Sequence, residues 1–181
     1  MIRWLASIAL LLAAPAAARS PAEWLAPSDR EMLDVIEFAS SGSRTKIVYV
    51  GRGETAETWT RRITIWSAPD YVLDARAFAE QAARIRQGII SDCPGVRATE
   101  LREFQWSGRP AAEYLIVCLL YPATGRPDIY LVRSIAGTSG DIAAAITFRR
   151  PPSEAETERA RAYLDTLLLC TSARDEQACN R

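Results

Sequence analysis

The sequence predicts an α+β fold in which an antiparallel β-sheet carries two amphipathic helices. Most segments of the chain are short, alternating or apolar runs separated by turns of hairpin length, which is typical of antiparallel strands. Two segments, 74–87 and 153–168, instead place apolar residues at helical spacing. The expected order is β-β-β-α-β-β-β-β-α with short connections and no internal repeat. The pattern therefore favours one globular domain.

The first 18 residues are expected to form a signal peptide. Arg3 supplies the positive start, residues 4–14 are apolar, and Ala16 and Ala18 have the A-x-A spacing of a cleavage site. The apolar run is shorter than the ~20 residues that a membrane span needs. We therefore expect cleavage after Ala18, a periplasmic or secreted protein, and no transmembrane segment in the mature chain.

Composition excludes several classes of function. The full chain has 22 basic and 22 acidic residues, and residues 1–18 contain one charge, Arg3, so the mature chain has 21 against 22, a net charge of −1. A nucleic-acid-binding domain would be expected to carry a basic excess. Histidine is absent, which removes Ser-His-Asp and Cys-His catalysis and every histidine-containing metal site. We predict no metal and no cofactor.

Four cysteines remain after removal of the signal peptide: Cys93, Cys118, Cys170 and Cys179. An even number in an oxidising compartment favours two disulfides, for which three connectivities exist. No C-x-x-C redox motif occurs, and the spacings of 25, 52 and 9 lack the close pairs of a four-cysteine zinc site. We favour Cys93–Cys118 and Cys170–Cys179.

The first half of the chain is expected to form a leader and three strands. Residues 19–30 contain Pro21 and Pro27 and are predicted to be an extended leader, followed by a globular domain over residues 31–181. Ser28 and Glu31 match a capping box, but VIEFA-SSGSR-TKIVYV favours strand, turn and strand. WTRRITIW alternates as a strand does, with Trp59 as its structural anchor. The Gly-x-Gly that precedes it lacks the rest of a phosphate-binding motif.

The second half is expected to contain the first helix, four strands and the last helix. The first helix would be capped by Asp70 or Asp74 and end at Gly88. Strands follow at 96–106, in AAEYLIVCLLY, in DIYLVRSIAG and in DIAAAITFRR. Ser153 and Glu156 form a second capping box. The apolar stripe behind it predicts a helix that continues to the Cys170 tail.

The sequence resembles a known group of proteins in four segments. The segments are the run VIEFASSGSRTKIVYVGRGETAETWTRRITI, the CPG turn, the apolar strand with a cysteine, and IYLVRSIAG. The members of this group are small exported proteobacterial proteins of unassigned function, whose fold is similar to the PsbP-like α/β/α sandwich. The resemblance covers about residues 31–170. It implies an antiparallel sheet with helices on its faces and a role in binding or assembly. No catalytic residue carries over from it.

The function that these observations favour is a non-enzymatic binding or assembly module of the cell envelope, with a protein or an envelope surface as partner. Aromatic residues and arginine dominate interface energetics. The candidate contact residues are Trp66, Trp106, Tyr121, Arg62 and Arg109, with Arg61 and Arg102 as further rim residues. Packing in the core is the competing interpretation of the three aromatic side chains.

The alternative is a small periplasmic hydrolase or lyase that uses carboxylates on strands. Glu103 and Glu113 lie on strands joined by a short turn, and this interpretation requires them to converge as acid and base. Glu100 has the opposite parity to Glu103 and would face the other way. The sequence identifies neither a reaction nor a ligand, and we assign no catalytic residue.

Overall fold

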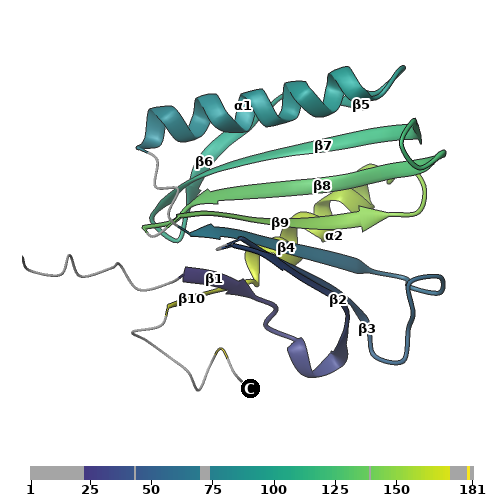
Figure 1. Ribbon diagram of the computed structural model, residues 1–181, viewed down its shortest axis with the longest axis horizontal. Helices are drawn as coiled ribbons and strands as arrows, with labels where there is room; N and C mark the ends of the chain where they lie inside the picture. Colours follow the sequence, from purple (N-terminus) through teal and green to yellow (C-terminus); the bar gives the residue numbers. More distant parts are fainter. Residues whose placement is uncertain (1–22, 43, 70–73, 139, 172–178, 180–181) are drawn as a thin grey trace, which may run out of the picture.

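The protein was analysed as a computed structural model that describes residues 23–42, 44–69, 74–138, 140–171 and 179. The predicted signal peptide and its cleavage site lie outside these residues. The α+β fold is confirmed, because the described chain forms mostly antiparallel β-structure with two helices packed on it (Figure 1). Within the described ranges, no helix combines the length and the apolar character that crossing a membrane requires.

The elements follow the predicted order with small additions. They are β1 (Glu23–Ala26), η1 (Arg30–Met32), β2 (Leu33–Ser41), β3 (Arg44–Gly51), β4 (Arg62–Pro69), α1 (Ala75–Asp92), β5 (Arg97–Ala98), β6 (Arg102–Trp106), β7 (Arg109–Tyr121), β8 (Arg126–Ala136), β9 (Gly140–Phe148), α2 (Glu154–Asp165) and β10 (Leu168–Thr171).

The main sheet has eight strands in the order β2-β3-β4-β9-β8-β7-β5, and β6 also pairs with β7. Every pairing in it is antiparallel. A separate two-stranded sheet joins β1 to β10 near the two ends of the described chain. The centre of the main sheet is therefore β4, β9 and β8, each of which is paired on both sides.

One face of the sheet is covered by α2. Leu164 and Ala160 pack there against the inward residues of β4, β8 and β9, which include Ile63, Leu131 and Ile142. The predicted capping box at Ser153 is confirmed: its side chain accepts from the Glu156 amide, and the Glu156 side chain accepts from the Ser153 amide. The main apolar core lies between α2 and the sheet.

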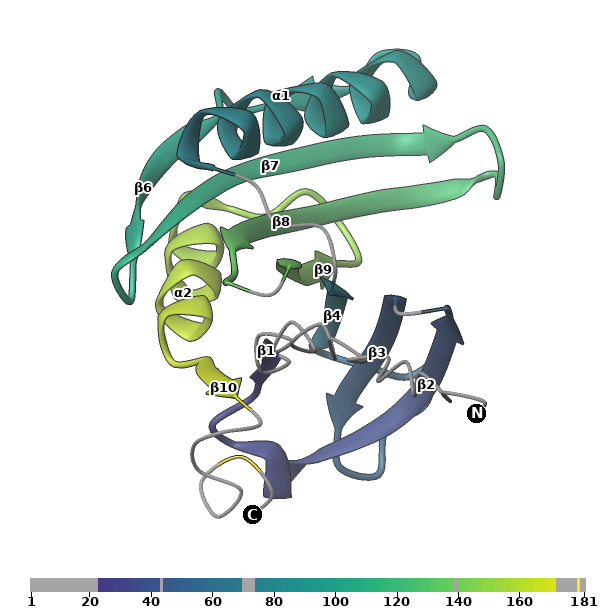
Figure 2. The ribbon, with the colours of Figure 1, turned by 60° about the vertical axis from the view of Figure 1, so that its left-hand side comes forward.

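The opposite face is covered by α1, but only in part. Phe78 and Ala82 of this helix pack on Ala112 of β7 and Ala136 of β8. Figure 2 shows α1 running alongside β7, whereas β3, β4 and β9 lie to one side of it. The disulfide Cys93–Cys118 joins the end of α1 to β7. Part of this face of the sheet is therefore left without a helix above it.

Several predictions about local structure are confirmed. The hairpin of β2 and β3 forms as the β-branched pattern indicated, and the Ser28–Glu31 pattern gives only the short η1 turn, which contains Glu31. Asp74 caps α1 by accepting from the Ala77 amide at 2.8 Å. Both favoured disulfides are present, Cys93–Cys118 and Cys170–Cys179.

The extended leader includes a short strand, β1, because Glu23–Ala26 pairs with β10. Two helix ends and one strand were predicted wrongly. The last helix ends at Asp165 and residues from Leu168 form that partner strand, so tertiary pairing overrides the helical spacing of the leucines. The first helix continues through Gly88 to Asp92, and the strand expected at 96–106 is divided into β5 and β6.

Candidate functional site

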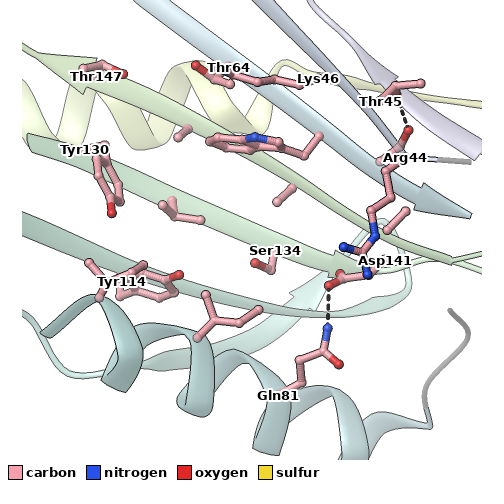
Figure 3. Close-up of a pocket in the computed structure, with 18 of the residues that line it drawn as sticks. Arg44, Thr45, Lys46, Thr64, Gln81, Tyr114, Tyr130, Ser134, Asp141 and Thr147 are labelled. Carbon is pink, nitrogen blue, oxygen red and sulfur yellow. Dashed lines mark hydrogen bonds between the residues drawn. The ribbon is translucent and has the colours of Figure 1, made fainter. Parts of the chain in front are cut away.

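A groove of about 810 Å³ lies on the uncovered part of the α1 face. One wall is the side of α1 that presents Gln81, Arg84, Ile85 and Ile89, which are spaced so that they share one helix face. The floor is formed by β3, β4, β9 and β8 (Figure 3). Its volume is in the range of small-molecule and cofactor sites.

Strand alternation determines which side chains enter the groove. Successive residues of a strand point to opposite faces, and residues directly opposite each other on neighbouring strands share a face. On β4 and β9 the groove-facing pairs are Arg62 with Thr147, Thr64 with Ala145, and Trp66 with Ala143. The side chains of Ala143 and Ala145 on β9 are much smaller than that of Trp66 on β4, so the space above β9 is left unfilled.

Basic residues outnumber acidic ones in the lining. Four cations, Arg44, Lys46, Arg62 and Arg84, face two carboxylates, Asp128 and Asp141. Lys46 donates to Glu37 at 2.7 Å. Within the part of the chain that the structure describes, the guanidinium groups of Arg44, Arg62 and Arg84 have no hydrogen-bonded or ion-paired partner. Once Glu37 is counted against Lys46, the lining keeps an excess of one positive charge. Asp128 is the groove carboxylate on which the charge of Arg62 acts.

Two polar atoms in this region are buried without a hydrogen-bond partner among the described residues: Nε of Arg62 and Oδ1 of Asp141. Both residues line the groove. Unsatisfied buried polar atoms are rare in native proteins, and they often mark the place of a bound ligand, ion or water. The two atoms lie at opposite ends of the groove, because Arg62 is opposite Thr147 whereas Asp141 is opposite Ala68.

The environment changes the protonation of several lining groups. Burial raises the pKa of Asp141 to about 6, although a hydrogen bond from the Ile142 backbone and one from Gln81 at 3.2 Å oppose the shift (Figure 3). Burial also raises the pKa of Asp128, which the charge of Arg62 partly offsets. It raises the pKa of Tyr114 to about 12 and that of Tyr130 further. Both phenols therefore stay protonated at neutral pH and can donate hydrogen bonds.

The two groove carboxylates are too far apart to act together on one bond. Asp141 is opposite Ala136 of β8, and Asp128 lies eight residues earlier on that strand. At about 3.3 Å per residue the separation is roughly 25 Å. The acid and base of a glycoside hydrolase lie ~5–9.5 Å apart. The groove carboxylates consequently do not form an acid–base pair.

A second charged cluster lies on the α2 face and is fully paired. Glu113 accepts from Arg133 Nη2 at 2.9 Å and from Arg161 Nε at 2.7 Å, and Arg133 Nη1 donates to Asp165 at 2.6 Å. Glu113 and Arg133 are 1% and 0% exposed. The carboxylate is held by two guanidinium groups and is enclosed by the core.

The convergence of Glu103 and Glu113 that the hydrolase or lyase alternative requires does not occur. Ser107 and Gly108 both have positive φ, at 49° and 74°, as a two-residue type I′ hairpin turn requires. This turn pairs Glu103 with Ala112 and Arg102 with Glu113. The two glutamates therefore point to opposite faces of the sheet, and Glu113 is neutralised by arginines.

The structure brings together two of the five predicted contact residues. Trp66, 36% exposed, and Arg62 both face the groove. Trp106 lies in the core on the α2 face, and Tyr121 is half-buried beside the Cys93–Cys118 region. Arg109 donates to Glu23 at 2.8 Å. These three lie outside the groove lining.

The additional rim arginines are engaged elsewhere. Arg61 donates to Asp29 at 2.6 Å and stacks on the Tyr163 ring at 4.2 Å. Arg102 lies over the Phe104 ring and 3.8 Å from Glu113. Both contacts belong to the α2 side of the molecule.

Sequence reasoning missed several groove residues: Arg44, Lys46, Gln81, Arg84, Asp128 and Asp141. One signal was available. In DIAAAIT, Ile142 and Ile146 point to one face of the strand, and Asp141, Ala143, Ala145 and Thr147 point to the other. A central strand with only small or polar residues on one face indicates that no large core side chain fills the space above it.

Comparison with known proteins gives no relative from which to assign the site: no family model matches the chain, and no curated protein matches it. The groove is interpreted from its own geometry.

Proposed function

We propose that this protein is an exported, disulfide-stabilised binding module of the cell envelope and that the groove beside α1 holds its partner. The observation that carries the proposal is the coincidence of three features in one place. They are a volume of about 810 Å³, a partly exposed tryptophan, and cations without partners among the described residues. Concave sites with an apolar surface and a few convergent polar groups are the usual places of ligand binding.

Export is supported by the covalent framework. Two disulfides fit an oxidising environment. The predicted signal peptide gives a route to the periplasm or the exterior. The arrangement of one helix on each face of an antiparallel sheet is also what a PsbP-like α/β/α sandwich would have, and we propose that the fold is a variant of it.

Geometry gives the hydrolase or lyase alternative little support. Glu103 and Glu113 face opposite sides of the sheet, and Asp128 and Asp141 are separated by most of the length of β8. The raised pKa values of Tyr114 and Tyr130 make these phenols poor proton acceptors at neutral pH. The groove is arranged for contact along its length and not for chemistry at one point.

Photo-crosslinking in the native cell envelope tests the proposed function. Ile85, a 44% exposed residue of the α1 wall, is replaced by a diazirine amino acid of similar shape. The control carries the same amino acid in place of Leu120, which is 63% exposed and lies outside the groove lining. Intact-mass measurement after irradiation detects a captured protein, lipid or glycan. We expect a discrete added mass from position 85 only.

A second variant tests whether the groove itself is responsible. Ala143→Leu fills the floor beside Trp66 without changing charge. It is expected to abolish the added mass at position 85 while the protein remains folded. The same mass from both diazirine positions, or its persistence in Ala143→Leu, would contradict the proposed function.

A further inference from the structure

We propose that the groove binds an acidic oligosaccharide, an elongated hydroxyl-rich chain that carries carboxylate or phosphate groups. This inference rests on the proposed function of the same groove and specifies the ligand class. Five properties of the groove lead to it: its length, its closed backbone, the spread of its hydroxyl groups, its charge, and the position of Trp66.

The groove is elongated along the strands. Arg62 and Asp141 lie toward its two ends, and the register places them six residues apart, since Arg62 and Ala68 lie on the same strand and Ala68 is opposite Asp141. At about 3.3 Å per residue this is roughly 20 Å. A compact metabolite would reach one end only, whereas a linear chain would reach both unsatisfied buried atoms.

The backbone of the floor is unavailable to a ligand. β3, β4, β9 and β8 each pair with a strand on both sides, so their amides and carbonyls are used within the sheet. An extended peptide that binds by strand addition needs an open edge. Recognition in this groove therefore depends on side chains, which disfavours strand addition as the binding mode.

Hydroxyl groups are distributed along the whole floor. Thr64, Ser134, Tyr130 and Thr147 line different parts of it, as Figure 3 shows, and Gln81 adds an amide at the Asp141 end. A long acyl chain would cover these groups without satisfying their hydrogen bonds, which costs free energy. A chain that carries hydroxyls at regular intervals provides donors and acceptors along the same length.

Charge selects an acidic chain over a neutral one. The lining contains four cations and two carboxylates, and Glu37 pairs with Lys46, which leaves an excess of one positive charge. Nε of Arg62 is buried without a partner among the described residues. A carboxylate or phosphate on the ligand would supply a charge-assisted hydrogen bond there. A hydroxyl of the same chain would donate to Oδ1 of Asp141.

Trp66 supplies the apolar contact that saccharide binding uses. Its side chain is partly exposed near the middle of the floor, opposite the small residue Ala143. The flat face of an indole ring packs well against the C–H face of a pyranose ring, because such a sugar presents axial hydrogens on one side and hydroxyls around its edge. The low floor at Ala143 and Ala145 leaves room for a ring to lie there.

The test is a titration of the mature protein with tetrasaccharides, followed by ¹H–¹⁵N NMR. A hexuronic-acid tetramer and a muramic-acid-containing tetramer are compared with a neutral glucose tetramer of the same length. We expect the acidic tetramers to shift the Trp66 indole N–H and the amides of β4 and β9. Binding is expected to weaken with added salt, because paired charges are screened. The tighter acidic tetramer identifies an exopolysaccharide or a cell-wall source.

Variants assign the contacts. Arg62→Gln and Trp66→Ala are each expected to weaken binding of the acidic tetramer about tenfold or more, as loss of a charge-assisted bond or an aromatic anchor does. Arg76→Gln is the matched control: it removes the same charge from α1, but Arg76 has a side chain 90% exposed and lies outside the groove lining. Its affinity should equal that of the parent protein. Thermal denaturation confirms that each variant is folded.

Several results would overturn the ligand class. Equal binding of the neutral tetramer, tighter binding of an acidic peptide or a fatty acid, or full affinity in Arg62→Gln would each do so. If neither acidic tetramer binds but the added mass from position 85 persists, the oligosaccharide proposal fails and the binding module stands. If both signals are absent, both proposals fail.

Discussion

Buried charged groups are ion-paired on one face of the sheet, whereas on the other face two of them keep a polar atom without a partner among the described residues. On the α2 face, the carboxylate of Glu113 is held between Arg133 and Arg161, and Arg133 extends on to Asp165. On the α1 face, Arg62 and Asp141 each keep a buried polar atom without a partner among the described residues, at opposite ends of an open groove. The same sheet supports both arrangements.

This contrast distinguishes charged groups that stabilise the fold through ion pairs from charged groups that are available to a ligand. Removing one member of a buried ion pair leaves an uncompensated charge and strongly destabilises a protein. A cation in an open groove is reached by water and is therefore tolerated until a ligand replaces that water. Burial alone does not identify a binding site. The informative observation is burial without a partner in a place that a ligand can enter.

Glu113→Gln is expected to have the largest effect on stability. It leaves Arg133 and Arg161 facing a neutral amide, with Asp165 as the remaining carboxylate in contact with Arg133. Loss of one partner from such a cluster costs about 3–5 kcal/mol. Urea denaturation followed by circular dichroism measures the change in the free energy of unfolding.

Glu103→Gln is the matched control for this variant. Glu103 is exposed and lies on the neighbouring strand, opposite Ala112 and facing the other side of the sheet. Surface substitutions of this kind usually change stability by no more than ~0.5 kcal/mol. Equal losses from the two variants would mean that the buried cluster has no special part in stability and that the contrast between the faces is wrong.

A pair of neighbouring alanines compares the packing of the two faces directly. Ala144 is 0% exposed in the core under α2, whereas Ala143 is half-buried and faces the groove. Ala144→Leu is expected to cost about 1–3 kcal/mol through overpacking. Ala143→Leu has free volume to enter and should cost less than ~1 kcal/mol. Differential scanning calorimetry of both variants tests this, and a larger loss for Ala143→Leu would show that the groove is closed in solution.

Local patterns predicted most elements of the fold. β-branched alternation identified the β2–β3 hairpin, and the capping box identified the start of α2. The even number of cysteines favoured two disulfides, and both are present. Elements whose state depends on a distant partner were missed. β1 and β10 exist because residues near opposite ends of the described chain pair with each other, and no local propensity encodes that contact.

Only part of the groove could be predicted from the sequence, because it also depends on contacts between distant segments. Trp66 and Arg62 stand out on one strand, but Arg44 and Asp141 join them only through the register of three further strands and the position of α1. Whether Glu103 and Glu113 share a face also depends on register. The length of the turn decides which alternate residues of the following strand face the core. This turn has two residues, and it can be recognised only from the positive φ of both Ser107 and Gly108.

A pH dependence centred on Asp141 is expected to be smaller than the losses in Glu113→Gln and Ala144→Leu. Burial raises its folded-state pKa to about 6, above the value near 4 of an unfolded chain. Between these two values the folded protein binds more protons than the unfolded one, so this group lowers the free energy of unfolding as the pH rises from about 4 to 6. The loss is fully present at pH 7.

Asp141→Asn removes the titration while it keeps an acceptor for the hydrogen bond from Gln81. At pH 7 the variant is expected to be more stable than the parent by roughly 1–2 kcal/mol, because water in the open groove limits the effect to less than the full shift implies. The difference should vanish near pH 4. Urea denaturation at pH 4, 5, 6 and 7 measures it, with Glu100→Gln, an exposed carboxyl, as the control. A difference that does not change with pH would mean that Asp141 is not desolvated by the groove, and Oδ1 would then already have its partner in solvent rather than lacking one for a ligand to supply.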